Sequence, residues 1–228
     1  MPPPSAALVA ARPVRIVAQT GDSVLAALTG FRVANALVAI GRSKAALDLN
    51  VSLASRIEAS LHTEAEMSGY GNLLLQAAMA AAHSGDAIRV RDLVREARAV
   101  AGHVSDRANH FRLCFGPANV GIHHVSALVS LGEGGLAVET AAGIDETGLR
   151  ALRRERRANH LVDVARGYSQ WGMRDDALAK LLEAETLAPR EVICRPLARG
   201  TIENLIERER GQPSGALQAR AERAGVTA

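Results

Sequence analysis

One segment of 26 residues constrains the fold of this chain more than any other. It reads VARGYSQWGMRDDALAKLLEAETLAP and spans residues 164–189. Apolar residues recur at helical spacing on both sides of Gly172, so the segment predicts two helices joined by a tight turn. Gly172 should end the first helix with a positive φ. Small side chains at Ala165 and Ala177 would let the two helices cross closely.

Weaker copies of this unit occur three times earlier in the chain. The turn glycines stand at 41, 85, 132 and 172, which are 44, 47 and 40 residues apart. The register of small and apolar residues matches a tetratricopeptide repeat, whose usual period is about 34 residues. The longer spacing predicts extra helices or linkers at 101–113 and 142–152. We therefore expect an all-α fold, a tetratricopeptide-like right-handed helical solenoid of about four helix pairs plus C-terminal capping helices.

The ends of the chain are expected to differ from the repeats. Residues 21–228 should form a single tetratricopeptide-like domain, and residues 1–20 should be an N-terminal arm or helix fragment. One more helix should start or be interrupted around Pro196. The Pro-Ser pair at 213–214 favours the start of a last helix that caps the stack.

The composition is that of a soluble globular chain, with 48% apolar, 22% charged and 3% aromatic residues. The net charge of +3 is too small to favour nucleic-acid binding. No run of about 18 apolar residues occurs, so no membrane partner is expected. Cys114 and Cys194 fit a reducing compartment better than a disulfide framework. We therefore expect a cytoplasmic protein.

The inner helix of each tetratricopeptide pair lines a concave groove with its second, fifth, ninth and twelfth positions. The second position holds Asn72, Asn119 and Asn159, and the ninth includes Ser126 and Arg166. An asparagine amide both donates to and accepts from a peptide backbone. The set therefore predicts contact with an extended peptide or a polar small molecule. The alternative is that the asparagines cap helix starts, where Asn is favoured.

Two adjacent histidines, His123 and His124, follow Asn119 in the stretch CFGPANVGIHHV. Neighbours on a helix point about 100° apart, so these two cannot bind one metal ion from the same face. The chain has no HExxH and no CxxC motif, and we expect no metal and no cofactor. His123 lies four residues after Asn119 and is predicted to face the groove. His160 and Arg166 could extend the same polar patch.

Two stretches, CFGPANVGIHHVSALVSLGE and RRANHLVDVARGYSQWGMRDDALAKLLEAETLAPREVICRPLAR, carry a resemblance to a known family. They resemble the C-terminal tetratricopeptide-like sensor region of actinobacterial Xre-family helix-turn-helix transcriptional regulators. The resemblance rests on a pattern F-G-P-T-N-V-x-x-H from Phe115 to His123, an arginine-rich motif that ends at Tyr168, and the R-P-L at 195–197. It covers roughly residues 30–210. Only about 20 residues precede the repeats, so no direct DNA binding is expected.

Three alternative functions are consistent with these observations. The first is a ligand- or peptide-binding helical repeat module of a regulatory type, with a small molecule or peptide in the concave groove. Its groove would be lined by Asn72, Asn119, His123, Ser126, Asn159 and Arg166. The second is a scaffold recruited as a small-molecule enzyme in secondary metabolism, although no complete catalytic motif is present and the balance is against an enzyme. The third is a protein interaction module, a homodimer or the binder of a regulatory protein partner, which an exposed apolar face over 197–206 would support.

Overall fold

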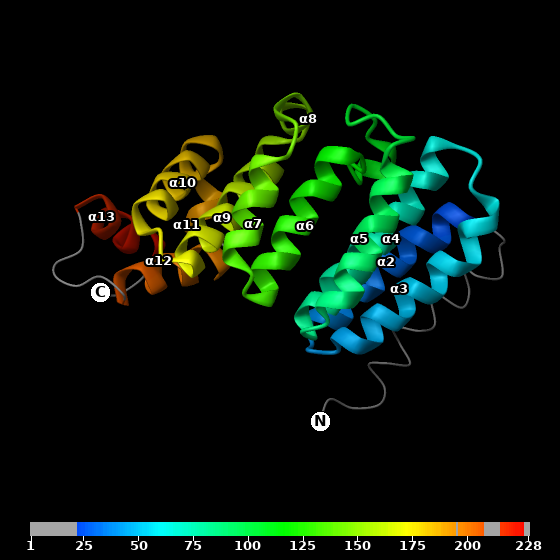
Figure 1. The fold of residues 1–228 in the computed structure, drawn as a ribbon, viewed down its shortest axis with the longest axis horizontal. Helices are drawn as coiled ribbons and strands as arrows, with labels where there is room; N and C mark the ends of the chain where they lie inside the picture. Colours follow the sequence, from blue (N-terminus) through cyan, green and yellow to red (C-terminus); the bar gives the residue numbers. More distant parts are fainter. Residues whose placement is uncertain (1–21, 195, 208–214, 226–228) are drawn as a thin grey trace. The chain divides into compact units, whose positions relative to one another are not determined.

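The computed structural model describes residues 22–194, 196–207 and 215–225, and every regular element within these ranges is a helix (Figure 1). The elements that begin before residue 124 are α2 (Ser23–Ala39), α3 (Ser43–Ile57), η1 (Glu58–Ser60), α4 (Glu64–His83), α5 (Ala87–Ala101), η2 (His110–Arg112) and α6 (Pro117–Leu131). The later ones are α7 (Gly134–Ala142), α8 (Glu146–Ala151), α9 (Arg154–Trp171), α10 (Arg174–Leu187), α11 (Pro189–Ile193), α12 (Pro196–Glu207) and α13 (Gly215–Ala224). The expected all-α composition is confirmed. The predicted arm at 1–20 and the predicted helix start at 213–214 lie outside the described residues.

Four helix pairs, α2–α3, α4–α5, α6–α7 and α9–α10, are joined by the same turn. The turn glycines Gly41, Gly85, Gly132 and Gly172 have φ values of 74°, 75°, 84° and 87°. In each turn the residue after the glycine donates its N–H to the carbonyl five residues earlier, as Met173 does to Tyr168 at 2.9 Å. This bond defines the Schellman motif, which requires the left-handed conformation that glycine adopts at low cost. The positive φ expected at Gly172 is confirmed, and the other three turns share it.

The residues at which paired helices cross are buried in all four pairs. They lie seven residues before and five residues after each turn glycine, and most are alanines. Each exposes at most 2% of its surface: Ala34 and Ala46, Ala78 and Val90, Val125 and Ala137, Ala165 and Ala177. Such small side chains allow the close helix contact that the repeat predicted.

The chain divides into two compact units, one ending at His123 and the other beginning at His124, so that the boundary falls within α6. In the first unit α2, α3 and α4 pack on one another, and α5 packs on α4. The Phe115 ring is 1% exposed and lies against α4 at Gly71. A Cβ at Gly71 would overlap the ring, so only glycine fits there. The single domain expected over 21–228 stays a prediction.

The loop between α5 and α6 has an unusual backbone. Three of its non-glycine residues have positive φ values of 54°, 62° and 53°: Phe111, Arg112 and Cys114. The Asn109 Oδ1 accepts hydrogen bonds from the Cys114 N–H at 3.2 Å and from the Cys114 Sγ at 3.3 Å. The Asp106 Oδ1 accepts from the Ala118 N–H at 2.9 Å and so caps the start of α6.

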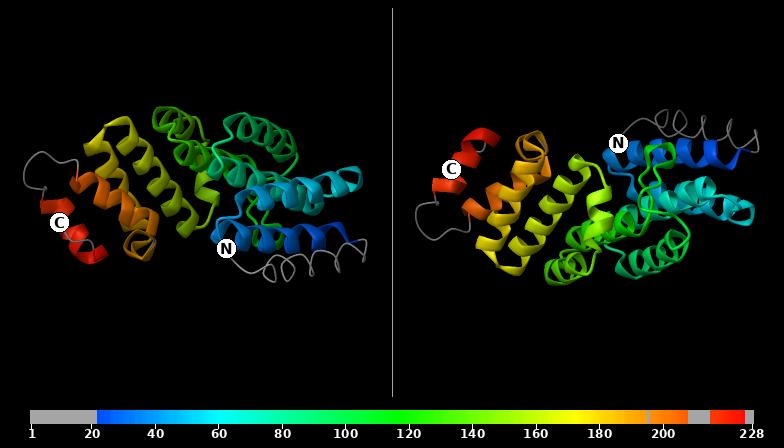
Figure 2. Two further views of the ribbon diagram at one scale, coloured as in Figure 1. Left: turned by 90° about the horizontal axis from the view of Figure 1, so that it is seen from below. Right: turned by 90° about the horizontal axis from the view of Figure 1, so that it is seen from above.

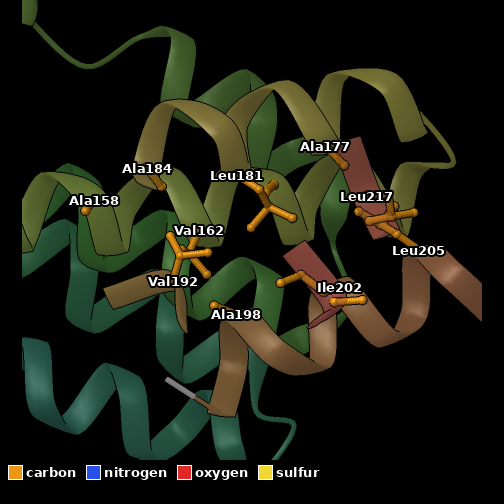
Figure 3. Packing of buried hydrophobic residues seen from close by; sticks show 12 residues of the cluster. Ala158, Val162, Ala177, Leu181, Ala184, Val192, Ala198, Ile202, Leu205 and Leu217 are labelled. Atoms are coloured by element: carbon orange, nitrogen blue, oxygen red, sulfur yellow. The ribbon is translucent and has the colours of Figure 1, made fainter. Parts of the chain in front are cut away.

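The core of the second unit lies among α9, α10, α11, α12 and α13. Figure 3 shows side chains from all five helices pointing toward one another, and each exposes at most 4% of its surface: Val162, Leu181, Val192, Ile202 and Leu217. The two views of Figure 2 show these helices, coloured yellow to red, lying side by side. Pro189 follows the end of α10 and begins the short α11, which stands between α10 and α12 in the chain.

Two glycines bring α7 close to α9 within the second unit. A Cβ at Gly134 would lie 2.6 Å from the Gly167 carbonyl oxygen, and a Cβ at Gly167 would lie 3.2 Å from the Gly134 carbonyl oxygen. The distance at Gly134 excludes a Cβ unless the backbone shifts, and the distance at Gly167 is tighter than an ordinary contact. The Gln170 Nε2 also donates to the Val129 carbonyl oxygen at 2.9 Å. These contacts hold the C-terminal half of α9, which carries Arg166.

Candidate functional site

The three predicted asparagines do not cap helices. Asn72 is the ninth residue of α4, and Thr63 is the N-cap of that helix. Asn159 is the sixth residue of α9, and Asn119 is the third residue of α6, where Asp106 supplies the capping oxygen. The capping interpretation is therefore wrong for all three residues. Contact of these residues with a ligand stays a prediction.

The predicted groove residues differ in how accessible they are. Asn119 is fully buried and Asn72 is 5% exposed. Asn159 is partly buried, and its buried Oδ1 has no hydrogen-bond partner among the described residues. His123 and Ser126 are partly buried on α6, and the His123 Nδ1 donates to the Asn119 carbonyl oxygen at 2.9 Å.

Arg166 lies in a pocket of about 400 Å³ between α9 and α12, which we call the α9–α12 pocket. The other residues that line it are Ser169, Gln170, Pro196, Leu197, Gly200, Thr201 and Asn204. The volume falls in the range of about 300–1,000 Å³ that is typical of small-molecule sites. Arg166 and Ser169 occupy the ninth and twelfth positions of the fourth inner helix. Two positions that the repeat assigns to the binding face therefore share one pocket.

The polar groups of the α9–α12 pocket are held by contacts within the second unit. The Arg166 Nη1 donates to the Asp163 Oδ1 at 3.0 Å, and the two side chains are 20% and 14% exposed. The Ser169 Oγ donates to the Asn204 Oδ1 at 3.4 Å. A partly buried guanidinium of this kind suits a carboxylate or phosphate partner. The pocket thus combines one cation, hydroxyl and amide groups, and an apolar wall from Pro196 and Leu197.

Two residues that line this pocket were not predicted from the sequence. Thr201 and Asn204 come from α12, beyond the last turn glycine, where no repeat register marks them. Ser169 could have been predicted as a lining residue, because it stands at the twelfth position of the inner helix.

The exposed apolar face over 197–206 that would support a homodimer is mostly absent from the described part of α12. Ile202 and Leu205 pack into the core at 0% and 3% exposure, and Ile206 packs partly against it. Leu197 is 50% exposed and lines the α9–α12 pocket. Of the large apolar side chains of α12, only Leu197 is exposed, which gives little support to a homodimer through this helix.

His160 lies in a different pocket from Arg166. It lines a pocket of about 120 Å³ among α8, α9 and α10, which we call the His160 pocket. Burial and, to a smaller extent, the Lys180 charge lower the pKa of His160 from 6.5 to about 4, and Glu183 opposes the shift. The imidazole is therefore neutral at pH 7. The structure splits the polar patch that the sequence predicted through Asn159, His160 and Arg166.

The described residues contain neither a metal-binding cluster nor a membrane-spanning helix. Across 22–194, 196–207 and 215–225, no group of three or more His, Cys, Asp and Glu side chains is arranged to hold a metal ion. None of the described helices combines the length and the hydropathy needed to cross a bilayer. Cys114 is buried, Cys194 is exposed, and both are free thiols.

The fold has counterparts among solved structures. Two crystal structures from Podosopora anserina, of a protein described as a kinesin light chain with nearly identical TPR-like repeats, match this chain. Both are 16% identical to it and cover 93% of it. One, a single-residue variant, matches over 90% of its own length with a TM-score of 0.55, and the other over 94% with 0.56. No protein-family model and no curated protein matches the sequence.

This likeness shows the fold class. The chain is an all-α, tetratricopeptide-like helical solenoid, as the turn glycines and crossing alanines predicted. At 16% identity the likeness extends to the fold alone, because one fold hosts many functions.

Proposed function

We propose that this chain is a ligand- or peptide-binding helical repeat module of a regulatory type. Its α9–α12 pocket would hold the carboxylate of a peptide or polar small molecule. One observation carries the proposal. Arg166, which the repeat register assigns to the binding face, lines a pocket of about 400 Å³ together with hydroxyl and amide side chains.

The charge arrangement supports a carboxylate as the recognised group. Asp163 orients the Arg166 guanidinium through one hydrogen bond of 3.0 Å. Because a guanidinium has five N–H donors, a ligand carboxylate can pair with those that remain. An arginine held in place before binding loses less conformational freedom when the ligand arrives.

The amides of the pocket support an extended peptide as the ligand. The Gln170 Nε2 and the Asn204 Oδ1 already have partners within the protein. The Gln170 Oε1 and the Asn204 Nδ2 supply one acceptor and one donor for a peptide backbone. Asn72, Asn119, His123, Ser126 and Asn159 are proposed as secondary contacts from their register in the repeat.

The regulatory role rests on the resemblance to Xre-family regulators. A chain with this sensor-like region would act in the cytoplasm through a protein partner. Ligand binding in the α9–α12 pocket would then change its affinity for that partner, since coupled binding sites affect each other reciprocally.

A peptide array tests the proposal. The protein is applied to random dodecapeptides, and the affinity of each hit is then measured by fluorescence anisotropy. Gly200→Leu is the test variant, because nothing lies within 4 Å of a Cβ at Gly200 and the new side chain can enter the pocket. Arg190→Gln, at an exposed residue of α11 outside the pocket, is the control.

We expect hits enriched in Asp and Glu. Gly200→Leu should weaken their binding at least about tenfold, or roughly 1.4 kcal/mol, and Arg190→Gln should leave it unchanged. Equal affinity of Gly200→Leu and the unaltered chain would refute the pocket as the binding site. Hits without acidic residues would refute the role of Arg166.

A further inference from the structure

The His160 pocket has features that the proposed function does not use. Three leucines contribute apolar walls: Leu149, Leu161 and Leu187. Charged residues from α8, α9 and α10 complete the lining: Glu146, Arg150, Arg157 and Glu183. Its 120 Å³ corresponds to roughly four water molecules. A drug-sized ligand needs more space than this.

Most charges in this lining are already paired. Arg150 forms an ion pair with Glu146, and Lys180 pairs with Glu183 at 2.8 Å. Arg157 is partly buried and forms no ion pair with any described residue. The pocket therefore holds one positive charge that the described part of the chain does not neutralise.

His160 adds a buried polar atom without a partner. The residue is 7% exposed, and its Nδ1 is buried and makes no hydrogen bond to the described residues. A buried nitrogen without a hydrogen bond is unfavourable, so native structures rarely leave one unmatched. Burial also keeps the imidazole neutral, with a pKa of about 4, so that one ring nitrogen can donate and the other accept.

We propose that the His160 pocket binds a small aliphatic monocarboxylate of roughly four to six heavy atoms, a size that follows from its volume. The carboxylate pairs with Arg157 and accepts a hydrogen bond from His160, and the alkyl part lies against the three leucines. Glu146 and Glu183 disfavour a second negative group. A simple inorganic anion would leave the apolar walls unused.

Sodium butyrate is the probe that tests this site. Long-range proton–nitrogen spectra of the ¹⁵N-labelled full chain at pH 7 report the ring nitrogens of His160. We expect these resonances to move with butyrate in a saturable way, with a Kd on the order of 1 mM. Sodium chloride at equal ionic strength should leave them unchanged. A linear response to butyrate, or an equal response to chloride, would overturn the proposal.

Two arginine variants and a second anion test whether Arg157 binds the carboxylate and whether the site prefers an aliphatic anion. Arg157→Gln should weaken butyrate binding at least about tenfold. Arg154→Gln, at an exposed residue of the same helix outside the pocket, should not. Equal effects of the two variants, or tighter binding of inorganic phosphate than of butyrate, would overturn it. Gly200→Leu should leave butyrate binding unchanged, which separates this site from the α9–α12 pocket.

Discussion

Replacement of Gly71 by alanine tests the packing of α4 against Phe115, in the loop before α6. Alanine is better than glycine in a helix interior by about 1 kcal/mol, so an open site would gain stability. A Cβ at Gly71, however, would lie 2.6 Å from the Phe115 Cε1 and still closer to Cζ and Cε2. The ring is buried and has little room to move. Overpacking costs about 1–3 kcal/mol, and an overlap this close belongs at the upper end, for a net loss of about 2 kcal/mol.

Gly200→Ala is the matched control, because Gly200 lies inside α12 with nothing within 4 Å of its Cβ position. It should stabilise the protein by up to about 1 kcal/mol. The two variants should therefore differ by about 3 kcal/mol, which is roughly 6–12 °C in Tm for a chain of this size. Thermal unfolding followed by far-UV circular dichroism measures the difference.

A second substitution isolates the contact itself. Phe115→Leu in the Gly71→Ala background removes the outer ring carbons and should recover part of the loss. We expect a coupling free energy of at least about 1 kcal/mol in the double-mutant cycle. If Gly71→Ala stabilised the protein as much as Gly200→Ala does, the reasoning would be refuted, because no ring could then lie over Gly71.

Three further substitutions follow from buried and capping groups. The lowered pKa of His160 means that the unfolded chain binds the proton more tightly than the folded chain does. The free energy of unfolding should therefore be highest above about pH 6.5 and fall by on the order of 2–3 kcal/mol toward pH 4. Urea unfolding of His160→Leu should lack that loss, and the same pH dependence in the variant and the unaltered chain would contradict it. The two polar side-chain atoms of Asn50 are buried without partners among the described residues, so Asn50→Leu should raise the free energy of unfolding by about 1–2 kcal/mol. This should appear as a higher urea midpoint, and a lower midpoint would contradict it. Asp106→Ala removes the cap of α6 and should lower the free energy of unfolding by about 1 kcal/mol. Asp48→Ala, at an exposed residue of α3, should lower it little. Equal losses in the two variants would count against the cap.

The helix pairs were predictable because their determinants are local. The turn at Gly172 needs a residue that accepts positive φ, and the crossing at Ala165 and Ala177 needs small side chains. Both requirements are visible as residue types at fixed spacing. A local signal was also overlooked, because Thr63 and Glu66 form a capping box that predicts the start of α4 and excludes Asn72 as a cap.

The α9–α12 pocket was only partly predictable because it depends on how separate helices pack. Arg166 followed from the repeat register, but Asn204 lies on a helix that no turn glycine announces. The placement of His160 away from Arg166 depends on α8 and α10, which bring Leu149 and Leu187 to the other side of α9. Nothing in the local sequence encodes these contacts between elements.

Amide chemical-shift mapping tests whether the ligand binds in the α9–α12 pocket. The ¹⁵N-labelled chain is titrated with the tightest acidic peptide from the array. We expect the largest shifts at pocket residues: Ser169, Gln170, Gly200, Thr201 and Asn204. Shifts concentrated in the first unit, with these five amides unmoved, would contradict it.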